Sequence, residues 1–125
     1  MTFDSRPETW YHINKVQQAL TDVVSRLQQR AVVHDQSKLQ APELDGFNEW
    51  TPRLRDLTYG SDEYKAALAA LAPTLKHHYA HNSHHPEHYN GGMAGMDLLD
   101  LVEMFCDWYA ASQRHADGEG RLKPT

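Results

Sequence analysis

The chain has 125 residues, which suits one domain large enough to bury a core without covalent crosslinks. Its single cysteine excludes an internal disulfide and any zinc site built from several cysteines of one chain. The formal charge of −5, from 12 basic and 17 acidic side chains, argues against duplex nucleic acid as the main partner, because such binding needs clustered Lys and Arg.

The sequence shows no secretory or membrane-spanning segment. Residues 1–10, MTFDSRPETW, lack the apolar run of a secretory signal. No stretch approaches the roughly 18 apolar residues that a membrane helix requires. We therefore expect a cytoplasmic protein without a membrane partner.

Helical patterns cover nearly the whole chain. From Pro7 to Leu27, apolar residues recur every three or four positions, and His12 lies on this apolar face. Strand patterns are absent. We therefore predict an all-α, single-domain bundle of about five to six helices, with a core at about 8–115 and a flexible tail at 116–125.

The predicted helices are separated by proline, glycine and capping residues. Pro52 is expected to end the helix that Pro42 opens, Ser61 caps the next, and Pro73 starts another. Residues 82–95 contain one proline and three glycines, which indicates an ordered loop. The expected helices span 7–27, 31–38, 42–50, 62–72, 73–81 and 96–115.

Residues 77–89, HHYAHNSHHPEHY, contain six of the nine histidines. A solvated loop has no need of six imidazoles. A metal site would explain several of them, since neutral imidazole is a common metal ligand. Such a site would also need ligands from elsewhere in the chain.

His34 and Asp35 are candidates for those ligands. They point about 100° apart on a helix, yet both can reach one ion at the helix edge. Imidazole nitrogen and carboxylate oxygen together suit zinc, manganese, iron or nickel. A lone His-Asp pair is also common at a helix end, and His12 taken alone is more typical of a core histidine with one hydrogen-bond partner.

The order of these motifs resembles the HD-domain superfamily of metal-dependent phosphohydrolases. A histidine in one helix, WYHINKV, is followed by an apolar run and HDxxK, here AVVHDQSK. The resemblance implies a helical fold with His12, His34 and Asp35 as metal ligands. It also implies that Lys38 contacts a substrate phosphate, although a solvated surface lysine is an equal alternative.

The superfamily places its last metal-binding aspartate on a late helix, and Asp107 in LVEMFCDWYAAS is the candidate. A carboxylate among such apolar neighbours needs a partner. Asp100 and Glu103 share its helix face and could orient the ligating imidazoles. Arg114 on the same face could contact phosphate or complement the helix dipole. The alternative is a solvated acidic stripe.

Superfamily branches with two or more metals add histidines between these motifs. By that resemblance we expect His78, His84 and His85 as further ligands, with Asp35 bridging two ions. HHPEHYNGG is loosely similar to the HHE motif and glycine loop of the cyclic-dinucleotide phosphodiesterases. However, His78 and His84 lie closer in sequence than that pattern requires. The chain also resembles a group of small bacterial and phage proteins that share HDxSK and HHPEHY.

The resemblance implies a phosphohydrolase that acts on a small phosphorylated substrate, with a nucleotide as our first expectation. A metal-activated water would attack the phosphorus atom. The expected cofactor is a divalent transition metal, one or two ions of Mn, Fe, Zn, Ni or Co.

Several side chains are candidates for the remaining roles. Asp35 and Lys38 would act at the reacting phosphate, and His88 or Glu43 would move the proton. Glu43 could instead supply charge to a helix N-terminus. Substrate contacts are expected from Lys38, Arg114 and Tyr89, of which Tyr89 could also pack in the core.

Two other functions share this ligand set. Some HD-fold proteins hold two irons and use dioxygen to oxidise a C–H or C–P bond. The chain could also be a non-catalytic, metal-dependent binding or regulatory protein with a closed ligand set. A homodimer is compatible with each.

Overall fold

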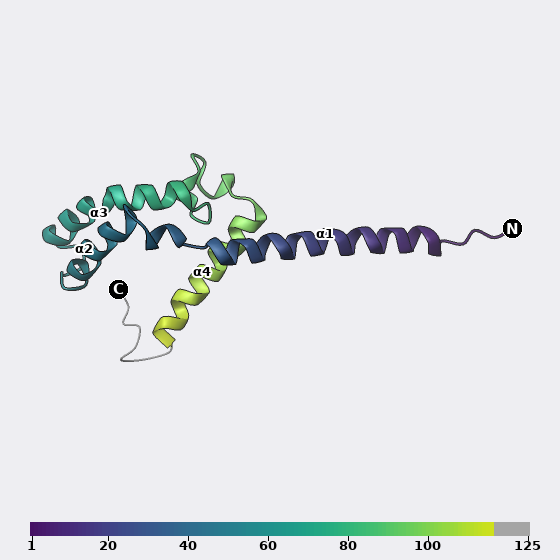
Figure 1. The fold of residues 1–125 in the computed structure, drawn as a ribbon, viewed down its shortest axis with the longest axis horizontal. Helices are drawn as coiled ribbons and strands as arrows, with labels where there is room; N and C mark the ends of the chain where they lie inside the picture. The colour runs from purple at the N-terminus through teal and green to yellow at the C-terminus, as the bar shows by residue number, and fades with distance from the viewer. Residues whose placement is uncertain (117–125) are drawn as a thin grey trace. The chain divides into compact units, whose positions relative to one another are not determined.

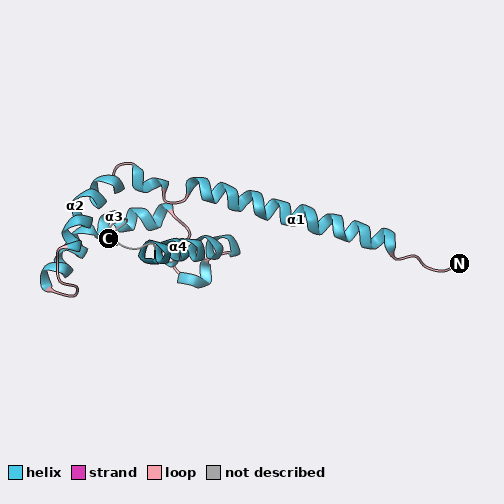
Figure 2. Cartoon of the chain, turned by 90° about the horizontal axis from the view of Figure 1, so that it is seen from below, coloured by secondary structure: helices cyan, strands magenta, loops and turns pink. Residues whose placement is uncertain are grey.

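In a computed structural model, residues 1–116 are described, and no strand occurs among them (Figures 1 and 2). The all-α prediction is confirmed. The described residues form four α-helices and three 3-10 helices, whereas the prediction was five to six helices; the HD-like arrangement stays a prediction. The α-helices are α1 (Arg6–Val33), α2 (Glu43–Arg55), α3 (Asp62–His81) and α4 (Leu98–Ala116).

Backbone contacts divide the chain into two compact units, residues 1–33 and the residues from His34 onward. The first unit contains α1, a continuous helix of 28 residues that includes the predicted segment 7–27 and the apolar AVV run. The second unit contains α2, α3, α4 and the 3-10 helices. The predicted flexible tail lies outside the described residues, apart from residue 116.

Two prolines lie inside helices that they were expected to bound. Pro52 lies within α2, which continues to Arg55, and Pro73 lies within α3. The predicted helices 62–72 and 73–81 are therefore one helix. An internal proline removes a single backbone donor, and the surrounding Ala and Leu residues of α3 are strong helix formers that maintain the helix across that gap. The predicted cap is confirmed, since the Ser61 hydroxyl accepts from the Tyr64 backbone N–H at 3.1 Å.

Helices α2 and α3 pack side by side in the second unit (Figure 1). They approach closely at Gly46, where an added Cβ would overlap the side chain of Thr74. Glycine therefore allows the two backbones to approach each other. This approach brings the first turn of α2 beside the C-terminal turns of α3, where the histidines lie.

The interior of the second unit is unusually polar. The buried apolar side chains are Ala67, Leu71, Met96 and Met104. The buried polar side chains are Glu43, His78, Asn82, His84 and Asp100. Buried charged and polar groups are costly unless they are paired, so this interior requires a connected polar network or an ion.

None of the described helices has the combination of length and apolar character needed to cross a bilayer.

Candidate metal centre

Asp35 lies two residues after the end of α1, where the chain turns into the 3-10 helix Gln36–Leu39. Its backbone adopts the left-handed conformation, with φ 54° and ψ 15°. Few residues other than glycine adopt this conformation, although aspartate does so more readily than most. The turn places the Asp35 carboxylate, half-buried, between the histidines of α3 and those of the following loop.

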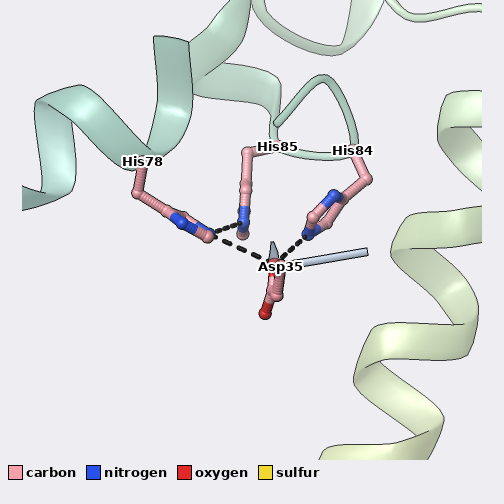
Figure 3. Close-up of side chains that lie close together, drawn as sticks. All are labelled: Asp35, His78, His84 and His85. Carbon is pink, nitrogen blue, oxygen red and sulfur yellow. Dashed lines mark hydrogen bonds and ion pairs between the residues drawn. The ribbon is translucent and has the colours of Figure 1, made fainter. Parts of the chain in front are cut away.

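The first donor group surrounds one oxygen of Asp35 (Figure 3). Asp35 Oδ1 lies 3.4 Å from His78 Nε2 and 3.3 Å from His84 Nε2. His85 Nε2 lies 3.0 Å from His78 Nε2. One ligand atom from each of these four residues lies within 4.8 Å of the others, which is a spacing that a single ion can bridge.

A second donor group lies beside the first and consists of His34, His84 and Asp107. His84 Nε2 lies 3.5 Å from Asp107 Oδ2, and His34 Nε2 lies 3.9 Å from Asp107 Oδ1. His34 Nε2 is also 3.6 Å from Asp35 Oδ2. The two oxygens of Asp35 therefore face different groups, and His84 belongs to both.

Two donor atoms in these groups are buried without a hydrogen-bond partner: Asp35 Oδ1 and His84 Nε2. Leaving a buried polar atom unsatisfied costs about 1–3 kcal/mol. A cation coordinated by both atoms would remove that cost. The mixed nitrogen and oxygen donors fit a divalent transition metal better than Mg²⁺ or Ca²⁺, which prefer oxygen alone.

Two glutamates, Glu103 and Glu43, form hydrogen bonds to the Nδ1 atoms of the candidate ligand imidazoles. Glu103 Oε2 accepts from His34 Nδ1 at 2.7 Å and lies 2.8 Å from His84 Nδ1. Glu43, fully buried, accepts from His78 Nδ1 at 2.7 Å and from His77 Nδ1 at 2.6 Å. In the three candidate ligands among these imidazoles, His34, His78 and His84, the other ring nitrogen, Nε2, faces Asp35.

The electrostatics of the groups favour metal-binding protonation states. Burial raises the pKa of the Asp35 carboxyl, but the nearby imidazoles of His78 and His84 and the charge of Lys38 outweigh burial and hold that pKa far below its ordinary value. Burial, with the charges of His84 and His78, lowers the pKa of His85 to about 4. His85 is therefore neutral at pH 7 and offers a lone pair.

The pKa of His78 shifts in the direction opposite to that of His85. Burial alone would lower the pKa of His78, but the nearby Asp35 carboxylate and the hydrogen bond to Glu43 raise that pKa above the ordinary value. Burial likewise raises the pKa of Glu43, and its bonds to Ser37, His77 and His78 more than reverse this effect. Glu43 is therefore an ionised hydrogen-bond acceptor at neutral pH.

Lys38 lies at the exposed edge of the first group. Its Nζ is 3.3 Å from Asp35 Oδ2 and 5.3 Å from the centre of the Phe47 ring. The side chain is 44% exposed, so the ammonium group faces solvent as well as Asp35. At this position, the Lys38 ammonium can bind an anionic ligand that approaches from solvent.

The loop between α3 and α4 is ordered, as predicted, and Asp100 holds it. Asp100 accepts from Ser83 Oγ at 2.7 Å, from the Tyr89 hydroxyl at 2.6 Å and from the Asp97 backbone N–H at 3.0 Å. A side chain at Gly95 would collide with the Tyr89 ring, which packs closely there. These bonds fix the segment that carries His84.

The structure brings together six of the seven predicted ligands: His34, Asp35, His78, His84, His85 and Asp107. The seventh, His12, lies in α1 of the first unit, and its predicted role as a ligand stays a prediction.

The other predicted site residues lie outside both donor groups. His88 Nδ1 donates to the Tyr79 carbonyl at 2.8 Å, and the Tyr89 hydroxyl is bonded to Asp100. Arg114 is an exposed residue of α4. Their predicted roles in substrate binding and proton transfer stay predictions.

Sequence reasoning gave Glu43 a proton-transfer role and did not identify it as the partner of His78. The only sequence signal was its place in the first turn of a predicted helix soon after HDxSK. It likewise missed Asn82, which donates to the His78 carbonyl at 2.8 Å and to Ser37 Oγ at 2.9 Å, joining α3 to the 3-10 helix after Asp35.

The chain belongs to the family described as "Family of unknown function (DUF5662)", whose model matches residues 1–124. Neither a curated protein nor a solved structure matches the chain. The resemblance to the HD-domain superfamily therefore stays a prediction.

Proposed function

We propose that the chain is a metal-dependent phosphohydrolase that acts on a small phosphorylated compound, with nucleotides as the first class to test. The observation that supports this is the gathering of four imidazoles and the Asp107 carboxylate around Asp35, in which Asp35 Oδ1 and His84 Nε2 are buried and unsatisfied. The order HDxxK, with the Lys38 ammonium beside Asp35, supports a phosphorylated substrate.

Asp35, His78, His84 and His85 would hold one ion. A second ion beside it would use His34 and Asp107 with the other oxygen of Asp35, because a single imidazole nitrogen can bind only one ion and His84 Nε2 cannot serve both. Asp35 would then bridge the two positions, and one or two ions of Mn, Fe, Zn, Ni or Co fit this donor set.

A divalent ion bound in such a site would lower the pKa of a bound water to near 7 and so supply a nucleophile at neutral pH. The protein contributes fixed charge and orientation around it. Lys38, at the exposed edge, would bind the phosphoryl oxygens and offset the negative charge that develops on them. The rigid Asp35 turn keeps this ammonium next to the ligands.

The test is a screen of nucleotides and phosphomonoesters for phosphate release by protein loaded with Mn²⁺, Fe²⁺, Zn²⁺, Ni²⁺ or Co²⁺. We expect release that requires metal and is abolished in Asp35→Asn. Iron-dependent oxygen consumption without phosphate release would instead show an oxygenase. Tight metal binding without phosphate release or oxygen consumption would show a binding or regulatory protein. Either of these two outcomes would contradict the proposed phosphohydrolase.

A further inference from the structure

We propose that Glu103 and Glu43 are positioning residues of the metal centre, and that each directs the coordinating nitrogen of imidazoles from separate chain segments toward the ion. The inference rests on the metal binding proposed above and does not depend on which reaction follows.

Glu103 connects three parts of the second unit. It lies on α4, His34 follows α1, and His84 lies in the loop after α3. One oxygen, Oε2, receives both His34 Nδ1 at 2.7 Å and His84 Nδ1 at 2.8 Å, and the two rings lie 4.4 Å apart. A carboxylate oxygen accepts, so a neutral imidazole bonded to it carries its proton on Nδ1 and keeps the lone pair of Nε2.

That lone pair points toward the donor groups. His84 Nε2 lies 3.3 Å from Asp35 Oδ1, and His34 Nε2 lies 3.6 Å from Asp35 Oδ2. His84 has almost no exposed surface, so water cannot replace Glu103 as the acceptor for its Nδ1–H. Without Glu103, either nitrogen could carry the proton, and the Nε2–H form cannot bind metal through Nε2.

Glu43 does the same for His78. Its Oε1 accepts from His78 Nδ1, and His78 Nε2 lies 3.4 Å from Asp35 Oδ1. Its other oxygen accepts from His77, which belongs to neither donor group and stacks on His81 with ring centres 4.1 Å apart. Glu43 thus directs one candidate ligand, whereas Glu103 directs two, including the one that both groups share.

Glutamine offers a discriminating substitution. Because both imidazoles share one oxygen of Glu103, the amide oxygen of glutamine can still accept from them, while alanine removes the acceptor. At position 43, glutamine can turn its oxygen to His78 and leave its amide toward the part-exposed His77. In both cases, alanine should impair metal binding strongly and glutamine should restore much of it.

The experiment titrates Co²⁺ into the full chain and its variants Glu43→Ala, Glu43→Gln, Glu103→Ala and Glu103→Gln. The matched control is Glu87→Ala, an exposed glutamate outside both groups. We expect affinity about 10–100-fold weaker in the alanine variants, with Glu103→Ala the weaker binder, intermediate values for glutamine and no change in the control. The visible Co²⁺ spectrum should change in both alanine variants, and circular dichroism checks that each is folded.

A second measurement does not depend on metal or on the stability of the alanine variants. Imidazole ¹⁵N spectra of metal-free wild type at alkaline pH should show His34, His78 and His84 with the proton on Nδ1. Protons on Nε2, or affinities in both alanine variants equal to the control, would overturn the inference. A wild type that binds no Co²⁺ would overturn the metal centre as well, whereas Co²⁺ binding without phosphate release would contradict only the proposed reaction.

Discussion

His84 is the residue that belongs to both donor groups. Its side chain is 1% exposed, Glu103 holds its Nδ1, and its unsatisfied Nε2 faces Asp35 and Asp107. A buried imidazole with Nδ1 hydrogen-bonded to a glutamate and Nε2 facing two carboxylates is suited to bind a cation.

We therefore predict that His84→Ala loses metal binding at the position formed by Asp35, His78, His84 and His85. The affinity for Mn²⁺ or Zn²⁺ should fall at least about 100-fold, since both a ligand and its glutamate contact are removed. Elemental analysis after dialysis measures the loss. His81→Ala is the matched control, because His81 is an exposed histidine of α3 bonded to a backbone carbonyl; equal metal content in the two variants would contradict the prediction.

Lys38 should affect catalysis and leave metal content unchanged. It contacts Asp35 but is half-exposed and is no metal ligand. We expect Lys38→Gln to lower kcat/KM for phosphate release about 100-fold, because a cation that stabilises transition-state charge is lost. The control is Lys65→Gln, at an exposed lysine on α3. A Lys38→Gln enzyme as active as this control would show that Lys38 is a surface lysine.

At the residue scale, the sequence predicted the candidate metal ligands better than the residues that hold those ligands in place. Asp35 and His84 were predictable because their residue types and order match a metal-binding pattern. The partnership of Glu43 with His78 was not, since it joins residues 35 positions apart and depends on how α2 packs against α3. Asp100 was expected to orient imidazoles, yet its described bonds hold the loop through Ser83 and Tyr89.

At the scale of elements, the contact between α2 and α3 determines where Glu43 meets the histidines. Gly46 allows this contact by leaving room for Thr74. The periodicity of the sequence located both helices but could not reveal the contact, because a glycine in a helix has the same sequence pattern whether or not another helix packs against it. Pro73 was misread for a related reason, since local rules do not include the strength of the surrounding helix.

Gly46→Ala should therefore destabilise the protein. On an unhindered helix surface the same change stabilises by about 1 kcal/mol, but here we expect a loss of about 1–3 kcal/mol because the new methyl group overlaps Thr74. Urea unfolding monitored by circular dichroism measures the free energy. The change should cost less in a Thr74→Ala background, where space has been made. A stabilised Gly46→Ala variant would show that the helices do not approach this closely.

At the scale of the whole molecule, the polar interior would couple metal binding to stability. More polar than apolar side chains are buried among the described residues of the second unit, and the candidate ligands come from α3, α4 and two connecting segments. Because an ion that binds only the folded state stabilises it, this unit would gain stability from metal in addition to its small apolar core.

Thermal unfolding should reflect this coupling. A metal at 100 times its Kd contributes about 2.7 kcal/mol, which corresponds to a rise in Tm of about 10–20 °C for a unit of this size. Differential scanning calorimetry with saturating Mn²⁺ and with EDTA measures the difference. The Asp35→Asn variant should show little metal-dependent shift, and an equal shift in that variant would place the stabilising ion elsewhere.

The most direct test of the metal centre is anomalous diffraction from crystals grown with Mn²⁺ or Zn²⁺. We predict an anomalous peak about 2.0–2.2 Å from the Nε2 atoms of His78 and His84 and from an oxygen of Asp35. The metal centre would be contradicted if crystals containing the metal showed no peak there, with Asp35 Oδ1 and His84 Nε2 bonded only to protein or water.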